Sequence, residues 1–370
     1  MISLIGLAAV LASGNGLAES DPVMTEEDFK IPLWDYSGAV RGGFGYKDNI
    51  LLSSTNAQGS AFWMSSGEVM VFRLPTRGWQ FTVFADASDT RYFNAPDVDN
   101  EQVALAVSQL SKDFGRGWKS TLGLNYMFQN QVFDNSANYT NENSVGLILG
   151  HTLTPRWSAR KTWGPLWVEG ELSGTRQWLE APLDSYWQFG PRAVIGYRWG
   201  RGSELAFSYR YARLNYDDRT QVDSAGAPLP NTRLALNTQI AELSLAQVWD
   251  QKRRWETSAS AGLASSLDDG SGFYDYTSCR VSGKARYHDE KWEVAAQAGS
   301  TWYDYATQTV STTDTALRRK TMLTLSVRAE RKLTGHLMVH ASYNWDRSLS
   351  NLDFDDYGAS TVLGGLTFTF

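Results

Sequence analysis

His340, Ser342 and Asn344 form the grouping in this sequence whose residue types are typical of nucleophilic catalysis. A serine nucleophile needs a base within hydrogen-bond reach, and that base needs a third group to orient it. The three residues alternate along HASYN, in a segment that reads as a strand, so their side chains point the same way in parallel. Parallel side chains do not converge on one proton path. The spacing therefore favours ordinary polar residues on one strand face, and we expect no enzyme.

The remaining candidate ligands and nucleophiles are scattered along the chain. His151, His288 and His336 show no metal-ligand spacing. Cys279 is the one cysteine, so it has neither a disulfide partner nor a second thiol beside it. These residues predict no bound metal and no cofactor.

Charged side chains recur in the middle of segments that otherwise read as strands. A dry core does not hold so many charges without pairing them, whereas a water-filled interior does. A ring of Arg and Lys around a pore favours anions, and the alternative is an interior filled by Arg–Glu pairs. Both signs occur together, so the sequence leaves these two readings open. The residues that we expect to line the interior are Arg192, Arg210, Glu242, Arg280, Lys284, Arg286, Arg328 and Glu330.

Alternation of apolar with polar or small residues runs through most of the chain, and this is the period of a β-strand. Residues 321–331, TMLTLSVRAER, place Leu, Val and Ala on one face and Thr, Ser, Arg and Glu on the other. Residues 119–128, KSTLGLNYMF, and 204–211, ELAFSYRY, repeat the pattern. A soluble β-sandwich or β-solenoid would also alternate. The mid-strand charges favour a membrane barrel, because a water-filled lumen tolerates them and the dry core of a sandwich does not without pairing.

Tight and long connections alternate along the sequence. Tight turns such as PTRGW (75–79) and FGRGW (114–118) are followed at once by a strand, and five of seven deliver a Trp at its start. Longer polar connections such as DNSANYTNEN (134–143) lie between them. Short periplasmic turns, longer outer loops and aromatic girdles are typical of an up-and-down outer-membrane barrel. We therefore predict an all-β, transmembrane, antiparallel barrel of about 16 strands (range 14–18), with both termini periplasmic and the Trp residues in the inner girdle.

The longer connections carry most of the clustered acidic side chains. LDDGSG begins like a calcium loop, but the rest of that spacing is missing. We expect solvated carboxylates, with divalent cations that bridge them to anionic lipopolysaccharide as the alternative. The clusters are Asp217–Asp218, Asp268–Asp269 with Asp275, and Asp353 with Asp355–Asp356.

No connection is long enough to fold into the lumen, which favours a monomer.

The N-terminal region divides into two segments ahead of the barrel. Residues 2–12 form a short apolar run, and Gly16-Leu17-Ala18 places small residues at the positions that a signal peptidase requires, so residues 1–18 predict a signal peptide. Residues 19–38 are acidic and contain Pro, which predicts a periplasmic N-terminal segment, and the barrel is expected over 39–370. The net charge of −6 argues against a nucleic-acid partner.

The chain ends TVLGGLTFTF, an alternating strand with Leu366, Phe368 and the terminal Phe370 on its apolar face. This ending resembles the C-terminal signal that the barrel-assembly machinery of the bacterial outer membrane reads. Two segments, VRGGFGYKDNILLSS (40–54) and NWDRSLSNLDFDDYGASTVLGGLTFTF (344–370), resemble the outer-membrane β-barrel porins often found beside polysaccharide-export systems. The C-terminal barrels of surface-lipoprotein assembly modifiers look similar, but a long helical repeat domain precedes them.

The resemblance implies a porin-like channel in the outer membrane of a Gram-negative bacterium. The channel would pass small solutes by passive diffusion or serve as a conduit for surface polysaccharide export. Its expected partners are outer-membrane lipids and lipopolysaccharide, the barrel-assembly machinery during biogenesis, and polysaccharide-export components. One alternative is a plugged barrel that acts as a scaffold for periplasmic or surface partners. A second is an outer-membrane enzyme that modifies lipids, for which His340, Ser342 and Asn344 are poorly arranged.

The alternation of 321–331 predicts which face of this strand meets lipid. Leu325→Arg should impair membrane insertion by about 2–4 kcal/mol if Leu325 lies near the bilayer midplane, whereas Ser326→Arg should be tolerated because it faces water. Refolding yield into lipid vesicles, read from heat-dependent migration on a gel, measures the difference. Equal effects of the two substitutions would mean that the predicted faces are exchanged.

Overall fold

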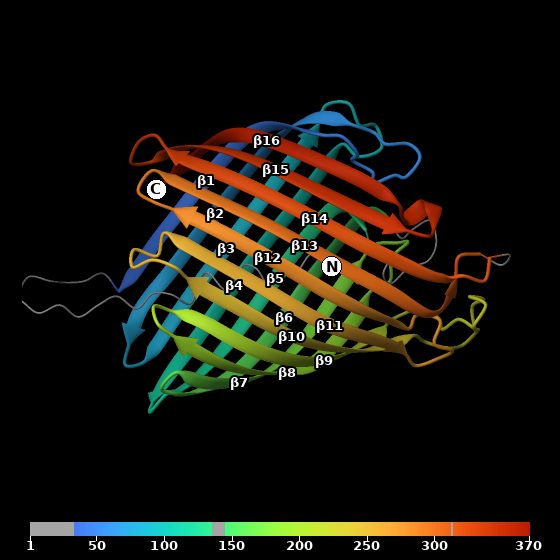
Figure 1. Cartoon of the computed structure of the whole chain (residues 1–370), viewed down its shortest axis with the longest axis horizontal. Helices are drawn as coiled ribbons and strands as arrows, with labels where there is room; N and C mark the ends of the chain where they lie inside the picture. The colour runs from blue at the N-terminus through green and yellow to red at the C-terminus, as the bar shows by residue number, and fades with distance from the viewer. Residues whose placement is uncertain (1–32, 135–144, 312–313) are drawn as a thin grey trace, which may run out of the picture.

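The computed structural model describes residues 33–134, 145–311 and 314–370. Sixteen strands follow one another around a single closed barrel, and each strand pairs antiparallel with its neighbours in the sequence (Figure 1). The first and last strands pair with each other, so the described sheet has no free edge. The predicted all-β, up-and-down barrel of 16 strands is confirmed. The predicted signal peptide (1–18) and most of the predicted segment 19–38 lie outside the described residues.

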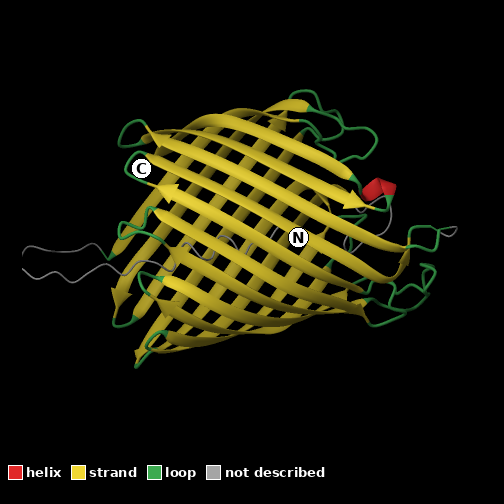
Figure 2. Cartoon of the chain, in the orientation of Figure 1, coloured by secondary structure: helices red, strands yellow, loops and turns green. Residues whose placement is uncertain are grey.

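The strands run from 13 to 19 residues and form most of the described chain (Figure 2). Among the described residues, the one helical element is the short 3-10 helix η4 (Asp353–Asp355), so no described helix is long and apolar enough to cross a bilayer. The strands are β1 (Trp34–Lys47), β2 (Ser60–Thr76), β3 (Trp79–Tyr92), β4 (Asn100–Gly115), β5 (Trp118–Asp134), β6 (Val145–Trp163), β7 (Leu166–Leu179), β8 (Tyr186–Trp199), β9 (Ser203–Tyr216), β10 (Ala235–Val248), β11 (Trp255–Asp268), β12 (Tyr276–His288), β13 (Trp292–Thr309), β14 (Leu317–Lys332), β15 (Leu337–Ser350) and β16 (Tyr357–Thr369).

The first strand begins earlier than the sequence indicated. β1 starts at Trp34, five residues before the expected start at residue 39, so WDYSG belongs to the barrel. Trp34 and Tyr36 alternate with Asp35 and Ser37, but the acidic segment before them hides this short alternation in the sequence.

The two ends of the barrel differ in the length of their connections, as the sequence predicted. At one end, here called the turn end, two-residue turns join strands at 77–78, 116–117 and 164–165. At the other, the loop end, the connection between β9 and β10 spans 217–234. The Arg-Gly pairs at 77–78 and 116–117 have positive φ at both residues, which is the type I′ geometry that follows the twist of a hairpin.

The outward face of the barrel is an apolar belt. Leu325, Phe207 and Val281 leave large parts of their side chains exposed, which is consistent with a wall that contacts lipid. The Trp residues that follow the tight turns lie outward at the turn end and four of them support the predicted girdle. These are Trp79, Trp118, Trp255 and Trp292.

Trp167 is an exception to the predicted girdle. It is the second residue of β7, so it has the opposite parity and only 4% of its surface is exposed. Its ring lies inside the barrel, 4.0 Å from the guanidinium of Arg160 and 5.7 Å from that of Arg198. Leu166 takes the outward position that the turn-plus-Trp pattern had assigned to Trp167.

The seam between β1 and β16 closes the barrel through close backbone contacts. Ala39 pairs with Thr369 and Lys47 pairs with Thr361, and Phe370 exchanges two backbone hydrogen bonds with Gly38. The C-terminal aromatic end is therefore a paired strand end. The side chains of Leu366, Phe368 and Phe370, the proposed assembly signal, are all more than half exposed on the outward face.

Gly365 is required by this seam. A Cβ atom there would lie 2.2 Å from the carbonyl oxygen of Gly42, whereas a Cβ on Gly364 would meet nothing closer than 3.9 Å. Gly365→Ala should therefore force the two strands apart and destabilise the barrel by about 1–3 kcal/mol, as overpacking does in other sites. Guanidinium unfolding of the refolded barrel measures the change. Gly364→Ala is the matched control, and similar losses for both would show that the seam tolerates a methyl group.

Candidate functional site

A contact across the mouth of the barrel identifies the inward face. β14 and β5 lie seven steps apart through β16 and β1, and nine steps apart the other way, so they stand nearly opposite each other. The ammonium of Lys320 on β14 lies 2.6 Å from a carboxylate oxygen of Asp134 at the end of β5. Lys320 and every second residue of β14 therefore face the lumen, and this set includes Arg328 and Glu330.

Cross-strand register carries this assignment around the wall, because directly paired residues share a face. Arg328 pairs with Ala295, and Ala295 pairs with Arg286. Arg280 pairs with Gly262, which pairs with Glu242. All of the residues expected to line the interior lie on the inward parity of their strands. They are Arg192, Arg210, Glu242, Arg280, Lys284, Arg286, Arg328 and Glu330.

These eight residues divide into paired and unpaired groups. Arg286 forms an ion pair with Glu293 at 2.9 Å, and Arg328 forms one with Glu330. Among the described residues, five of the eight make no ion pair. Unpaired charges and Arg–Glu pairs, the two arrangements that the sequence left open, therefore occur on the same wall. The five are Arg192, Arg210, Glu242, Arg280 and Lys284.

The structure adds inward charges that sequence reasoning missed. Arg156 on β6 makes no ion pair within the described residues, and it packs beside Gly123, where a Cβ atom would meet its side chain at 2.6 Å. Glu171 on β7 pairs directly with Arg192. The outward Trp157 next to Arg156 could have revealed this parity, but Pro155 interrupts the pattern in the sequence.

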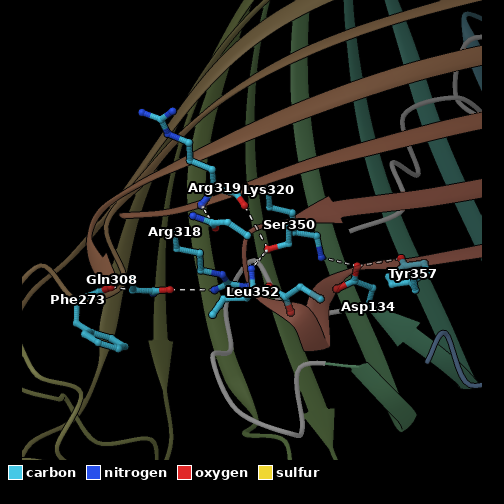
Figure 3. A network of polar contacts seen from close by, with 11 residues as sticks. Asp134, Phe273, Gln308, Arg318, Arg319, Lys320, Ser350, Leu352 and Tyr357 are labelled. Carbon is cyan, nitrogen blue, oxygen red and sulfur yellow. Dashed lines mark hydrogen bonds and ion pairs between the residues drawn. The ribbon is translucent and has the colours of Figure 1, made fainter. Parts of the chain in front are cut away.

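A buried polar network occupies the loop end of β14 (Figure 3). Arg318 and Lys320 have 0% and 2% of their surface exposed, respectively. Arg318 forms an ion pair with Asp355 on η4, donates a hydrogen bond to Gln308 Oε1 at 2.9 Å, and lies 4.5 Å from the ring of Tyr305. Burial raises the pKa of the Asp355 carboxyl, and the Arg318 guanidinium opposes that shift. The expectation of solvated acids is wrong for Asp355, because its connection folds back onto β14.

The second half of this network holds the end of β5 against the opposite wall. β5 pairs with β4 only as far as Asn130, but it continues beside β6 to Asp134. Asp134 accepts hydrogen bonds from Lys320 at 2.6 Å and from Tyr357 at 2.9 Å. The end of β5 therefore reaches across the mouth. The inward segment is the end of a strand, which the expectation about loop length did not consider.

The enzyme-like grouping does not form a relay. His340 Nδ1 lies 3.0 Å from Thr367 Oγ1, and Asn344 accepts a hydrogen bond from Ser326 at 2.7 Å. His340, Ser342 and Asn344 face the lumen from one strand, and among the described residues no hydrogen bond joins them. The described chain also contains no group of three or more His, Cys, Asp or Glu residues that could hold a metal ion.

Comparison with known proteins yields likenesses of fold. No family model and no curated protein sequence matches this chain. An anion-selective porin from Comamonas acidovorans is similar in structure, with a TM-score of 0.48 at 10% identity over 91% of this chain and 99% of the porin. OmpT, an outer membrane protein of Vibrio cholerae, gives 0.45 at 10% identity over 91% and 97%. OccD1 (OprD) gives 0.46 at 10% identity over 90% and 95%.

The protein is a multi-pass β-barrel of the outer-membrane type. Its own geometry carries this conclusion, because a closed 16-stranded sheet with an apolar outer wall and a charged inner wall satisfies its backbone in lipid.

The buried network predicts a sharp difference between neighbouring arginines. Arg318→Met leaves Asp355 buried without its ion-pair partner and should cost about 3–5 kcal/mol of unfolding free energy. Arg319→Met removes only an exposed contact of 3.5 Å to Asp304 and should cost less than about 1 kcal/mol. Equilibrium unfolding in guanidinium measures both. Equal costs would mean that the buried pair does not stabilise the loop end.

Proposed function

We propose that the barrel is a passive channel for small hydrophilic solutes and that its lumen favours anions. The wall from β6 to β12 supports the preference. On this arc Arg160, Arg198 and Arg286 are balanced by ion pairs to glutamates. The inward cations left without an ion pair among the described residues number five, against three carboxylates without one, those of Glu171, Glu242 and, at the loop end of β11, Asp268. The five are Arg156, Arg192, Arg210, Arg280 and Lys284.

One observation carries the proposal more than any other. Arg192 on β8 and Arg210 on β9 are directly opposed in the sheet. Like charges at directly opposed positions destabilise a sheet. Arg210 interacts electrostatically with Glu171 as well as with Arg192, yet no ion pair forms between these residues. A diffusing anion relieves this repulsion as it passes, which is a reason for a water-filled pore to keep both guanidiniums.

The inward end of β5 supports small solutes over long chains. Asp134, at the end of β5, is held to the opposite wall by Lys320 and Tyr357, so this strand end narrows the mouth at the loop end. A conduit for surface polysaccharide export, which rests on the resemblance of residues 40–54 and 344–370, would require this strand end to be displaced. A plugged scaffold barrel is the remaining candidate, and the same strand end would be part of its plug.

The exposed outer wall and its ends define the expected surroundings of the channel. Outward cations at the turn end lie over girdle rings, with Lys112 at 5.1 Å from Trp79 and Arg331 at 5.3 Å from Trp292. Such pairs suit phosphate headgroups at a membrane interface. Lipids, lipopolysaccharide and the barrel-assembly machinery are therefore the partners proposed for this protein, with the C-terminal Phe370 strand as the assembly signal.

Planar-bilayer recording tests the channel and its selectivity. The refolded barrel should produce discrete current steps, and its reversal potential in a potassium chloride gradient should show an anion preference. Arg210→Gln should lower the anion-to-cation permeability ratio about two- to threefold, because unit charges about 7 Å apart in water interact by about 0.6 kcal/mol. Arg213→Gln, on the outward face of the same strand, is the matched control. A correctly folded but silent barrel would reject the channel and favour the scaffold.

A further inference from the structure

A recess of about 190 Å³ lies in the lumen wall beside the seam that closes the barrel. Its lining comes from β14, β15 and β16 on one side of the seam and from β1, β2 and β3 on the other, so only closure of the barrel assembles it. The polar lining consists of two guanidiniums, one carboxylate, one imidazole and three hydroxyl groups. These belong to Arg41, Arg328, Asp86, His340 and the serines 66, 88 and 342.

Two polar atoms of this recess are buried without a partner. His340 is 4% exposed, and its Nδ1 is occupied by Thr367, but its Nε2 has no hydrogen-bond partner among the described residues. Arg41 pairs through Nη2 with Glu68 at 2.8 Å, while its Nε is likewise buried without a partner in the described chain. Buried groups of this kind are costly unless water or a ligand satisfies them, so the recess has capacity for a polar guest.

The charges of the recess are of both signs. Asp86 makes no ion pair among the described residues, although it interacts electrostatically with Glu68, Arg41 and Arg328. The guanidiniums of Arg41 and Arg328 already have glutamate partners, so neither neutralises Asp86 by direct contact. A simple anion would meet the open carboxylate of Asp86, and a simple cation would leave the buried Nε–H of Arg41 without an acceptor.

We propose that this recess binds a small zwitterion of the α-amino acid type. The ammonium group of the solute lies toward Asp86, and its carboxylate lies toward Arg41. His340 Nε2 is a donor or an acceptor according to its tautomer, and a zwitterion offers a partner for either state. The three serine hydroxyls complete a polar lining for a guest of this size. The site rests on the proposed function in one respect, since the solute must enter the lumen.

Binding is tested on the full refolded chain in detergent, where no conduction is needed. Isothermal titration compares L-alanine, a zwitterion, with L-lactate and L-alaninamide, which keep the same carbon skeleton but carry one charge each. L-alanine should bind saturably and at least about tenfold more tightly than either analogue, the factor that corresponds to 1.4 kcal/mol. Equal binding of all three, binding of L-lactate alone, or no binding of L-alanine would overturn the inference.

Matched variants locate the site. Asp86→Asn, which keeps the size of the side chain, should weaken L-alanine binding about tenfold or more and remove its advantage over L-lactate. Ser258→Ala, at an inward position of β11 outside the recess, is the control and should leave the affinity unchanged. Unchanged L-alanine binding in Asp86→Asn would place the ligand elsewhere and reject the recess.

The result is separable from the channel proposal. Current steps without L-alanine binding would reject this site and keep the channel, whereas L-alanine binding to a silent barrel would reject the channel and keep the site.

Discussion

The constraint on which the whole structure depends is that every backbone N–H and C=O group inside a bilayer must be satisfied by the protein itself. A sheet meets this requirement only when its first and last strands pair, and here β1 and β16 do so from Ala39–Thr369 to Lys47–Thr361. The approach is close enough that Gly365 has no room for a Cβ atom. The recess beside the seam exists for the same reason, because its two sides are far apart in the sequence and meet only on closure.

Closure also separates two environments along every strand. Alternate side chains face lipid or the lumen, so an apolar outer wall and a charged inner wall arise from one pattern. The outer wall is selected for insertion, whereas the inner wall is free to carry charge because it is in contact with water. Arg192 and Arg210, directly opposed on that inner wall, are an arrangement that a dry core would not hold without a counterion.

The loop end shows how a barrel of this kind narrows its own mouth. Arg318 and Lys320 project from one strand into a buried network that reaches η4 through Asp355 and the end of β5 through Asp134. Each cation is buried against a carboxylate from a distant part of the chain, so the network fixes inward segments to a wall that is otherwise regular. The function proposed here depends on both features, the charged wall for selectivity and the anchored end of β5 for size.

The sequence by itself determined the class, the number of strands, the alternation of turns and loops, and the inward parity of residues such as Arg280 and Arg328. These follow from local periodicity and turn chemistry, which neighbouring residues encode. The sequence misplaced Trp167, because a shift of one residue at a turn reverses parity. It also missed the inward end of β5 and the burial of Asp355, because strand ends give no local sign of bending inward. Only the tertiary structure decided which charges are paired, where Asp134 reaches across the mouth, and that Asp86, Arg41 and His340 share one recess. Those facts depend on register and closure between strands that the chain separates by hundreds of residues, and no local pattern carries them.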